Sequence, residues 1–368
     1  MPLKWKKVWI ADETYESAGV FDVNNDGVPD IVSGGFWYEG PDFKKKRPVA
    51  EIKKYGEYYD DFSTIALDVN GNGRLDVITG GWWGNNLRWY ENPGDPKKPW
   101  AEHIIAETGN IETTRAWDID GDGIVEIVPN TPPTREVKIF KLKTDANGKG
   151  TGEFTKHVIF EFPEGEKQGH GLGCGDIAGN GRMDIVLARG WLECPKNPLT
   201  EKWTWHEDFP KPPWGWAGSV PMLVVDLNGD GKNEIITGNA HGYGLWWSEQ
   251  KIVGGKREWI HHPIDPYNAQ YHDLQWIDID GDGQPELVTG KRHRAHCGND
   301  TGEWDDVGLY YFKWNGESFA KQVIDYGPIG TGKGCGIHFA VADLRGSGRL
   351  DIVAPGKDGL YVFYNEGL

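Results

Sequence analysis

The stretch FDVNNDGVPDIVSGGFWYEG, residues 21–40, decides the fold of this chain. Asp or Asn side chains alternate at Asp22, Asn24 and Asp26, and an apolar run follows Asp30 before a Gly-Gly pair and three aromatic residues. A short apolar run bounded by Asp and Gly is typical of a β-strand beside a tight turn. The same pattern recurs along the whole sequence, so it indicates one unit of a repeat.

Seven copies of this unit occupy the 368 residues. Their leading acids are Asp22, Asp68, Asp118, Asp176, Asp226, Asp278 and Asp343. The spacing of roughly 45 to 65 residues is close to the length of a four-stranded propeller blade. The 52 Gly and 19 Trp residues fit short, half-buried strands joined by tight turns. We therefore predict an all-β fold, a seven-bladed β-propeller of four-stranded blades, with residues 1–368 as a single domain.

The two ends of the chain are expected to meet in one blade. The seventh copy ends at residue 368 with no sequence left for a fourth strand, whereas KWKKVWI at residues 4–10 alternates as the fourth strands of other copies do. The N-terminal strand should therefore complete the last blade and close the ring, because closure removes the exposed edges of an open sheet.

The repeated loop D-x-[DN]-x-[DN]-G-x-x-[DE] resembles the FG-GAP or VCBS repeat class of seven-bladed β-propellers, and the resemblance covers essentially the whole chain. Propellers with such loops serve as adhesion modules, lectins and lyases. The resemblance therefore implies the fold but does not by itself select an activity.

Calcium is the cofactor that the acidic loops suggest, because oxygen ligands at positions one, three, five and nine can converge on a hard cation. We expect it to have a structural role, with the fullest ligand sets being Asp22, Asn24, Asp26 and Asp30; Asp118, Asp120, Asp122 and Glu126; Asp226, Asn228, Asp230 and Glu234; and Asp278, Asp280, Asp282 and Glu286. The second copy, with Asn70 and Asn72, should bind more weakly.

Two loops depart from the pattern, and one alternative applies to all seven. The fourth copy has Ala178 at position three, and the seventh has Arg345 there with Ser347 at position five, so we expect both loops to be free of metal. The Arg345 guanidinium could take the place of the ion. Alternatively, Asx-type turns hold every loop through side-chain to backbone hydrogen bonds without any ion.

The ends of the second strands should share one face, opposite the acidic loops. Aromatic and basic residues gather there: Trp37, Trp82, Trp83, Trp191, His241, Tyr243, Arg292, His293, Arg294 and His296. Exposed aromatic rings beside hydrogen-bonding groups suit a sugar, so we predict a carbohydrate ligand. The alternative is that several of the Trp residues pack between blades.

A second set of residues should ring one mouth of the central channel. The residue six places before each leading acid is, in order, Glu16, Phe62, Glu112, His170, Val220, His272 and Ile337, and His338 follows one place later. Because the strand that leads into the acidic loop is the innermost of a blade, two acids and three imidazoles should converge. Such a group could bind a second divalent metal or transfer protons, unless it only lines a solvated channel.

The segment GKRHRAHCGNDTGE, residues 290–303, resembles a motif in the propeller domain of aldos-2-ulose dehydratase and its relatives. The matching residues are Lys291, Arg292, His296, Asn299 and Asp300. Related propellers include lyases that cleave rhamnosyl-glucuronate linkages. The cupin-like domain of the dehydratase has no counterpart in these residues, so the dehydratase's own reaction is not expected.

These features lead us to predict a carbohydrate-active lyase or dehydratase that acts by β-elimination on a uronate or keto sugar. The base would be His170 or His272, the cation that holds the enolate Arg115, Arg292 or a metal, and the acid Tyr59 or His338. Two alternatives use the same face: a non-catalytic sugar-binding or adhesion propeller, and a scaffold that docks a protein.

Several partners and compartments are disfavoured. The net charge of −17 argues against nucleic acid, since its binders present basic stripes. No run of roughly 18 apolar residues is present, so membrane insertion is not expected. The N-terminus lacks the apolar core of a signal peptide, which fits a cytoplasmic protein or an exported one whose leader has been removed. The sequence does not indicate an oligomeric state.

Overall fold

The computed structural model describes residues 2–209, 215 and 217–368. These residues form strands, turns and bends and include no helix, hence none long and apolar enough to cross a membrane. The all-β architecture expected from the repeats is confirmed.

Within the described residues, five sheets have four antiparallel strands each. In chain order of their inner strands, four of them are β2 (Gly19–Phe21), β3 (Asp30–Ser33), β4 (Phe36–Glu39) and β5 (Lys45–Pro48); β8 (Ile65–Leu67), β9 (Asp76–Gly80), β10 (Asn86–Glu91) and β11 (Ala101–Glu107); β12 (Thr113–Trp117), β13 (Glu126–Asn130), β14 (Glu136–Thr144) and β15 (Gly150–Glu161); and β24 (Tyr271–Ile277), β25 (Glu286–Lys291), β26 (Val307–Trp314) and β27 (Phe319–Gly327).

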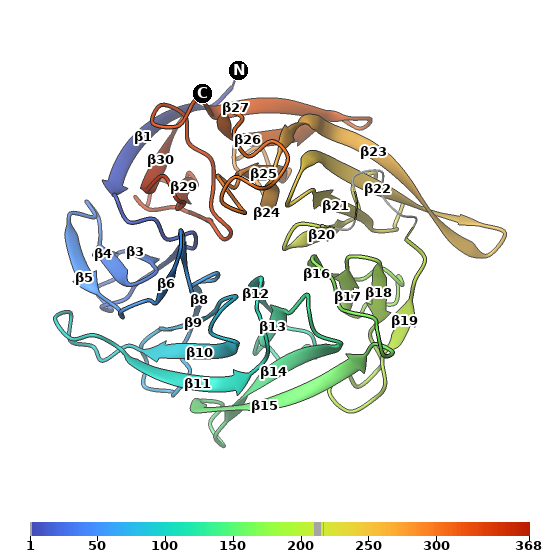
Figure 1. The fold of residues 1–368 in the computed structure, drawn as a ribbon, viewed down its shortest axis with the longest axis horizontal. Coiled ribbons are helices and arrows are strands. Elements are labelled where there is room, and N and C mark those ends of the chain that lie inside the picture. Colours follow the sequence, from blue (N-terminus) through green and yellow to red (C-terminus); the bar gives the residue numbers. More distant parts are fainter. Residues whose placement is uncertain (1, 210–214, 216) are drawn as a thin grey trace.

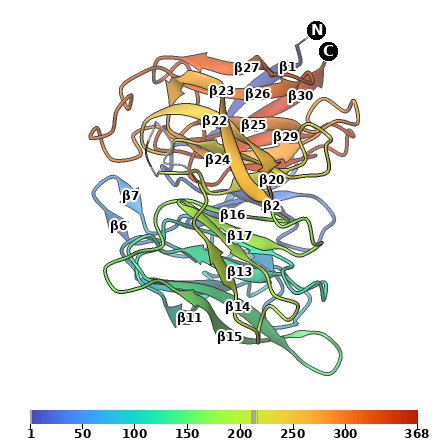
Figure 2. The same cartoon turned by 90° about the vertical axis from the view of Figure 1, so that its right-hand side faces the viewer.

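An eight-stranded sheet contains two further antiparallel units, which are joined by the parallel pairing of β16 with β20. One unit is β16 (Leu172–Gly175), β17 (Asp184–Leu187), β18 (Gly190–Glu193) and β19 (Thr204–His206), and the other is β20 (Met222–Val225), β21 (Glu234–Gly238), β22 (Tyr243–Val253) and β23 (Lys256–Ala269). A separate hairpin of β6 (Lys54–Tyr55) and β7 (Tyr58–Tyr59) projects from the edge of one face (Figure 2).

The remaining sheet brings the two ends of the chain together. Its strands are β28 (Ala340–Ala342), β29 (Asp351–Ala354), β30 (Leu360–Gly367) and, from the N-terminus, β1 (Lys4–Ala11). β1 runs antiparallel to β30, with Val8 opposite Val362. The two termini consequently lie side by side at the rim of the ring (Figure 1).

The sheets are arranged around a central axis as a β-propeller (Figure 1). β12, β16, β20 and β24 lie nearest the axis, and β11, β15, β23 and β27 lie at the outside. The hydrophobic core is divided among the gaps between neighbouring sheets; for example, Ile78 and Leu87 of one sheet pack with Ile127 and Phe140 of the next. This packing fixes the orientation of the inner strands, which carry the candidate site.

Each acidic loop joins an inner strand to the second strand and is held by its own acids. In the first loop, Asp22 accepts the backbone N–H groups of Asp26 (3.1 Å) and Gly27 (2.7 Å). The position-nine acids are all buried: Asp30, Asp76, Glu126, Asp184, Glu234, Glu286 and Asp351. Asp30 accepts the N–H groups of Val23 (2.9 Å) and Gly40 (2.7 Å). The side-chain to backbone hydrogen bonds of the metal-free alternative are therefore present.

Candidate functional site

Four residues converge at one mouth of the central channel. Glu112 and His170 precede β12 and β16, His272 belongs to β24, and His241 lies between β21 and β22. One oxygen or nitrogen atom of each lies within 4.8 Å of those of the other three. Residues from four repeats, in three sheets, meet here because each occupies the corresponding place in its own repeat or the loop beside it.

Glu112 is the centre of this cluster. Its Oε1 lies 2.9 Å from His272 Nε2 and 3.3 Å from His170 Nε2. Burial alone would raise the pKa of Glu112, but the adjacent His170 and His272 imidazoles hold it well below its usual value. Burial and the Arg292 guanidinium lower the pKa of His272 well below its usual range. The cluster thus pairs an ionised carboxylate with a neutral imidazole at His272.

The backbone fixes the tautomer of His170. Its Nδ1 lies 2.7 Å from the carbonyl oxygen of Gly218, to which it must donate a proton. His170 Nε2 therefore faces the Glu112 carboxylate at 3.3 Å, and this buried atom has no hydrogen-bond partner of ordinary geometry among the described residues. A proton or a metal ion between this nitrogen and the carboxylate oxygen would satisfy both atoms.

Asp300 orients two further imidazoles. Its Oδ2 lies 2.8 Å from His241 Nδ1 and its Oδ1 lies 2.9 Å from His296 Nδ1, while the two rings stack at 4.0 Å. Burial raises the pKa of Asp300, but the two imidazoles more than offset this and lower it. Burial also lowers the pKa of His241 to about 4. Ionised Asp300 therefore keeps the proton on each Nδ1, which leaves each Nε2 as an acceptor.

Arg292 connects two buried carboxylates. Its Nε and Nη2 donate to Glu16 (2.9 and 3.3 Å), and its Nη1 donates to Glu112 Oε1 at 3.3 Å. The Lys357 ammonium lies 3.8 Å from Glu16. Two cations and two carboxylates therefore balance, so that the guanidinium brings little unpaired positive charge to the site.

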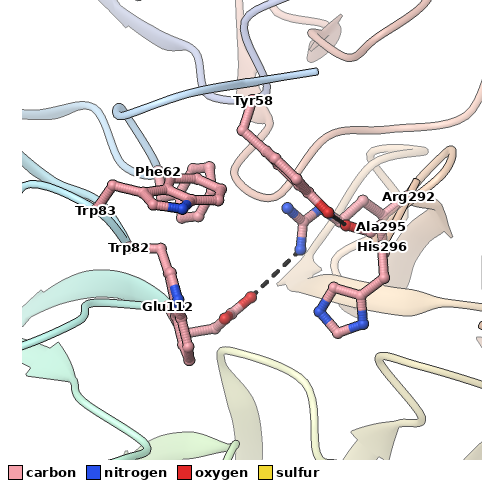
Figure 3. A pocket seen from close by; sticks show the side chains of 8 residues that line it. All are labelled: Tyr58, Phe62, Trp82, Trp83, Glu112, Arg292, Ala295 and His296. Atoms are coloured by element: carbon pink, nitrogen blue, oxygen red, sulfur yellow. Dashed lines mark hydrogen bonds and ion pairs between the residues drawn. The ribbon is translucent and has the colours of Figure 1, made fainter. Parts of the chain in front are cut away.

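A pocket of about 80 Å³ opens beside this cluster. It is lined by Tyr58, Phe62, Trp82, Trp83, Glu112, Arg292, Ala295 and His296. In Figure 3 the rings of Phe62 and Trp83 lie across the pocket from Arg292 and His296. Trp83 also stacks on Tyr55 of the projecting hairpin at 5.2 Å. The pocket thus has an aromatic wall and a polar wall, which is the combination expected for a polar ring-shaped ligand.

The FG-GAP-like repeat family matches residues 68–128 and 226–289. The chain is an FG-GAP-repeat β-propeller. Among solved structures, BBS1N in complex with ARL6DN is similar over 99% of this chain and 96% of that chain, with 10% identity and a TM-score of 0.54. Rhamnogalacturonan lyase YesW is similar over 98% and 72%, with 11% identity and a TM-score of 0.47. No curated protein sequence matches the chain. These likenesses concern the fold alone.

The propeller brings together many of the residues predicted for the site. His170, His241 and His272 meet at the cluster, and His296, Arg292, Trp82 and Trp83 line the pocket. Arg294 is not among the residues that line the pocket; its Nη2 and Nε donate to Glu57 at 2.5 and 3.0 Å. Tyr243 is exposed and donates its hydroxyl proton to Asp305.

Arg115 and His338 lie elsewhere, along a separate channel cavity of about 420 Å³. The Arg115 guanidinium donates to Asp273 at 2.8 Å, and both residues are buried. His338 Nδ1 accepts the backbone N–H of Thr64 at 3.1 Å. Each of the two side chains is engaged in joining blades across the channel, and neither lines the pocket.

Tyr59 is also outside the pocket, and its neighbour Tyr58 takes the predicted place. Successive side chains of a strand point to opposite faces, so Tyr59 packs against Tyr15 (4.3 Å) while Tyr58 faces Arg292 and His296. Tyr58 had no sequence signal because its hairpin lies outside the repeated pattern, and Lys357, whose ammonium lies 3.9 Å from the Tyr58 ring, lies in a turn of the seventh copy.

Trp37 and Trp191 are not available to a sugar. Their exposed fractions are 2% and 1%, and both belong to hydrophobic clusters between sheets. Trp191 stacks on His206 at 4.2 Å. The inter-blade packing alternative therefore applies to these two residues, since the third strand of a blade faces its neighbour.

Two loops with full sets of expected calcium ligands already hold a cation of the protein. The Lys141 ammonium contacts Asp122 and Glu126 in the third loop, and the Lys313 ammonium contacts Asp280 and Asp282 in the sixth. In the seventh loop Arg345 donates to Asp351 at 2.9 Å, as expected. The acids of the third and sixth loops do not fit calcium while these side chains stay in place.

Proposed function

We propose that this propeller is a carbohydrate-acting carbon–oxygen lyase whose active site is the channel-mouth pocket. The reaction would be a β-elimination on a uronate or keto sugar. A proton α to the carboxylate or carbonyl moves to a base, the carbon–carbon double bond forms, and the β-oxygen leaves with a proton. The observation that carries the proposal is the Asp300–His296 pair, whose free imidazole nitrogen belongs to a pocket with an aromatic wall.

His296 is proposed as the general base, in place of His170 or His272. Its Nδ1 proton is held by Asp300, so Nε2 can take a proton from a substrate in the pocket. His272 is fully buried, which prevents direct contact with a substrate. Tyr58, in the same pocket, is proposed as the acid for the leaving oxygen; burial raises its pKa far above the usual value and keeps its hydroxyl protonated.

The cluster of Glu112, His170, His241 and His272 is proposed to hold a divalent transition metal. Three imidazoles and one carboxylate suit such an ion, and Gly218 and Asp300 orient two of the imidazoles from behind. A bound ion would supply Lewis-acid stabilisation of the enolate. This role matters because the charge of Arg292 is already balanced by Glu16 and Glu112.

Calcium remains a proposal for the loops that contain Asp22, Asn24 and Asp26, and Asp226, Asn228 and Asp230. No lysine from the third strand enters these two loops among the described contacts, although Lys232 contacts Asp230 from within its own loop. We propose a structural role for such ions, because the loops lie on the face opposite the pocket.

The experiment is to incubate the protein with uronate-containing glycans and 2-keto sugars and to follow the ultraviolet absorbance of a new conjugated double bond. His296→Ala should lower the rate by about 10²- to 10⁴-fold, as loss of a general base typically does. The matched control is His157→Ala in the outer strand β15, where the imidazole contacts the Leu199 carbonyl far from the pocket. Sugar binding without any absorbance change would instead identify a non-catalytic sugar-binding propeller.

A further inference from the structure

The residue on the third strand beside each position-nine acid differs among the blades. In β14, Lys141 pairs with Glu126 across the sheet, and in β26, Lys313 reaches Glu286. The corresponding side chains in β4, β10, β18 and β22 are glutamates: Glu39, Glu91, Glu193 and Glu249. The third strand therefore places a positive side chain beside the acidic loop in two blades and a negative one in four others.

In the third loop, the Lys141 ammonium lies where the acids converge. Its Nζ is 3.1 Å from Asp120, 2.7 Å from Asp122 and 2.5 Å from Glu126, and it also donates to the Ile124 carbonyl at 3.0 Å. Burial alone would lower the pKa of Lys141, but its hydrogen bonds to these carboxylates raise it above the usual value. The ammonium is therefore charged and fully coordinated by oxygen atoms.

The sixth loop repeats this arrangement with different residues. The Lys313 ammonium donates to Asp280, lies 2.7 Å from Asp282 and lies 3.3 Å from Glu286. Two loops in separate blades thus use a lysine from the same strand position. A calcium ion needs six to eight oxygen ligands at about 2.3–2.6 Å, and these loops present their carboxylates to an ammonium instead.

The glutamates at this strand position bring a negative charge toward the loop, where the lysines bring a positive one. Glu91 accepts a hydrogen bond from Asn70 of the second loop at 2.9 Å, and His103 lies 3.0 Å from its other oxygen. Histidines hold Glu193 and Glu249 in the same manner, at 2.9 and 3.1 Å. In these blades the residue opposite the position-nine acid is itself an acid, although Lys251 of β22 lies 3.3 Å from Glu249.

We propose that Lys141 and Lys313 are built-in cations that replace calcium in the third and sixth loops. In these two loops the full set of acids then does not suffice for calcium, because the lysine on the third strand already pairs with them. This inference concerns the face opposite the pocket and is independent of the proposed lyase activity.

The test is the number of calcium ions per chain, measured by native mass spectrometry at saturating calcium. Lys141→Gln should bind one ion more than the wild-type chain. The control is Lys143→Gln on the same strand, which should bind the wild-type number, because the Lys143 side chain is exposed and pairs with Glu153 across the hairpin and not with a loop acid among the described contacts. Lys313→Gln should also gain one ion, and it tests the proposal separately if Lys141→Gln does not fold.

Asp120→Asn in the otherwise wild-type chain should leave the calcium number unchanged. Loss of an ion in this variant would show that the third loop binds calcium with Lys141 in place, and would overturn the proposal. A folded Lys141→Gln or Lys313→Gln protein with the wild-type calcium number would also overturn it, because the loop would then lack calcium for another reason.

Discussion

Replacement of Arg292 by Met is expected to destabilise the propeller strongly. The guanidinium makes three hydrogen bonds that join Glu16 and Glu112, and the three side chains are at most 6% exposed. Removing one partner of a buried ion pair typically costs about 3–5 kcal/mol, because the remaining charge stays buried. Lys357 stays near Glu16 and His272 stays bonded to Glu112, so we expect about 3 kcal/mol, at the lower end.

The assay is urea unfolding followed by circular dichroism, together with the melting temperature, which should fall by about 6 °C in a chain of this size. Arg294→Met is the matched control, since Arg294 pairs with Glu57, whose side chain is 44% exposed. Exposed pairs are worth less than about 1 kcal/mol. Equal losses of stability in the two variants would refute the view that Arg292 neutralises two buried carboxylates at the channel mouth.

Four further predictions follow from the contacts described above. Burial raises the pKa of Asp61 from 3.8 to about 6. The free energy of unfolding is therefore highest below pH 3.8, where Asp61 is protonated in both states, and it falls as the pH rises through 6, because the folded protein must then bury a charged carboxylate. Asp61→Asn should thus exceed wild type by roughly 2–3 kcal/mol in urea unfolding at pH 8 and match it near pH 4; equal stability at both values would contradict this. Asp300→Asn should slow elimination by more than tenfold with little change in melting temperature, and full activity would exclude Asp300 as the residue that orients His296. Chelation of calcium by EGTA should lower the melting temperature, because ions that bind only the folded state stabilise it; an unchanged value would remove structural calcium. Deletion of residues 1–10 should destabilise the protein far more than any loop change, because it removes β1 from β30, and a truncated protein of native stability would contradict this pairing.

The sequence predicts the arrangement of the blades well because each repeat supplies the same short signals. Counting back from each leading acid places Glu112, His170 and His272 together, as the structure does. The reason is that equivalent residues of blades arranged around one axis lie at the same height and distance from it. The same count fails for His338, which lies one residue further along and joins a different cavity. Successive side chains on a strand point to opposite faces, so a shift of one residue moves a side chain to the other face. A sequence without regular alternation does not show which face a given residue takes.

Other features depend on contacts between repeats or between strands. Trp37 and Trp191 follow the second strands as predicted, yet both are buried against neighbouring sheets. Lys141 and Lys313 follow the position-nine acids of their loops by 15 or more residues, so the ligand pattern alone gives no sign of them. Tyr58 comes from a two-stranded hairpin that has no counterpart in the described residues of the other repeats. Such contacts become visible only when the blades are assembled.

The mass of the products from a uronate-containing glycan tests the central claim most directly. If the channel-mouth pocket catalyses β-elimination, wild-type protein should give two fragments whose masses sum to that of the substrate, one of them carrying the new double bond. His296→Ala should give almost none of either. Fragments whose masses sum to substrate plus one water would indicate hydrolysis, and elimination of unchanged rate in His296→Ala would place the chemistry outside this pocket; either result would contradict the account.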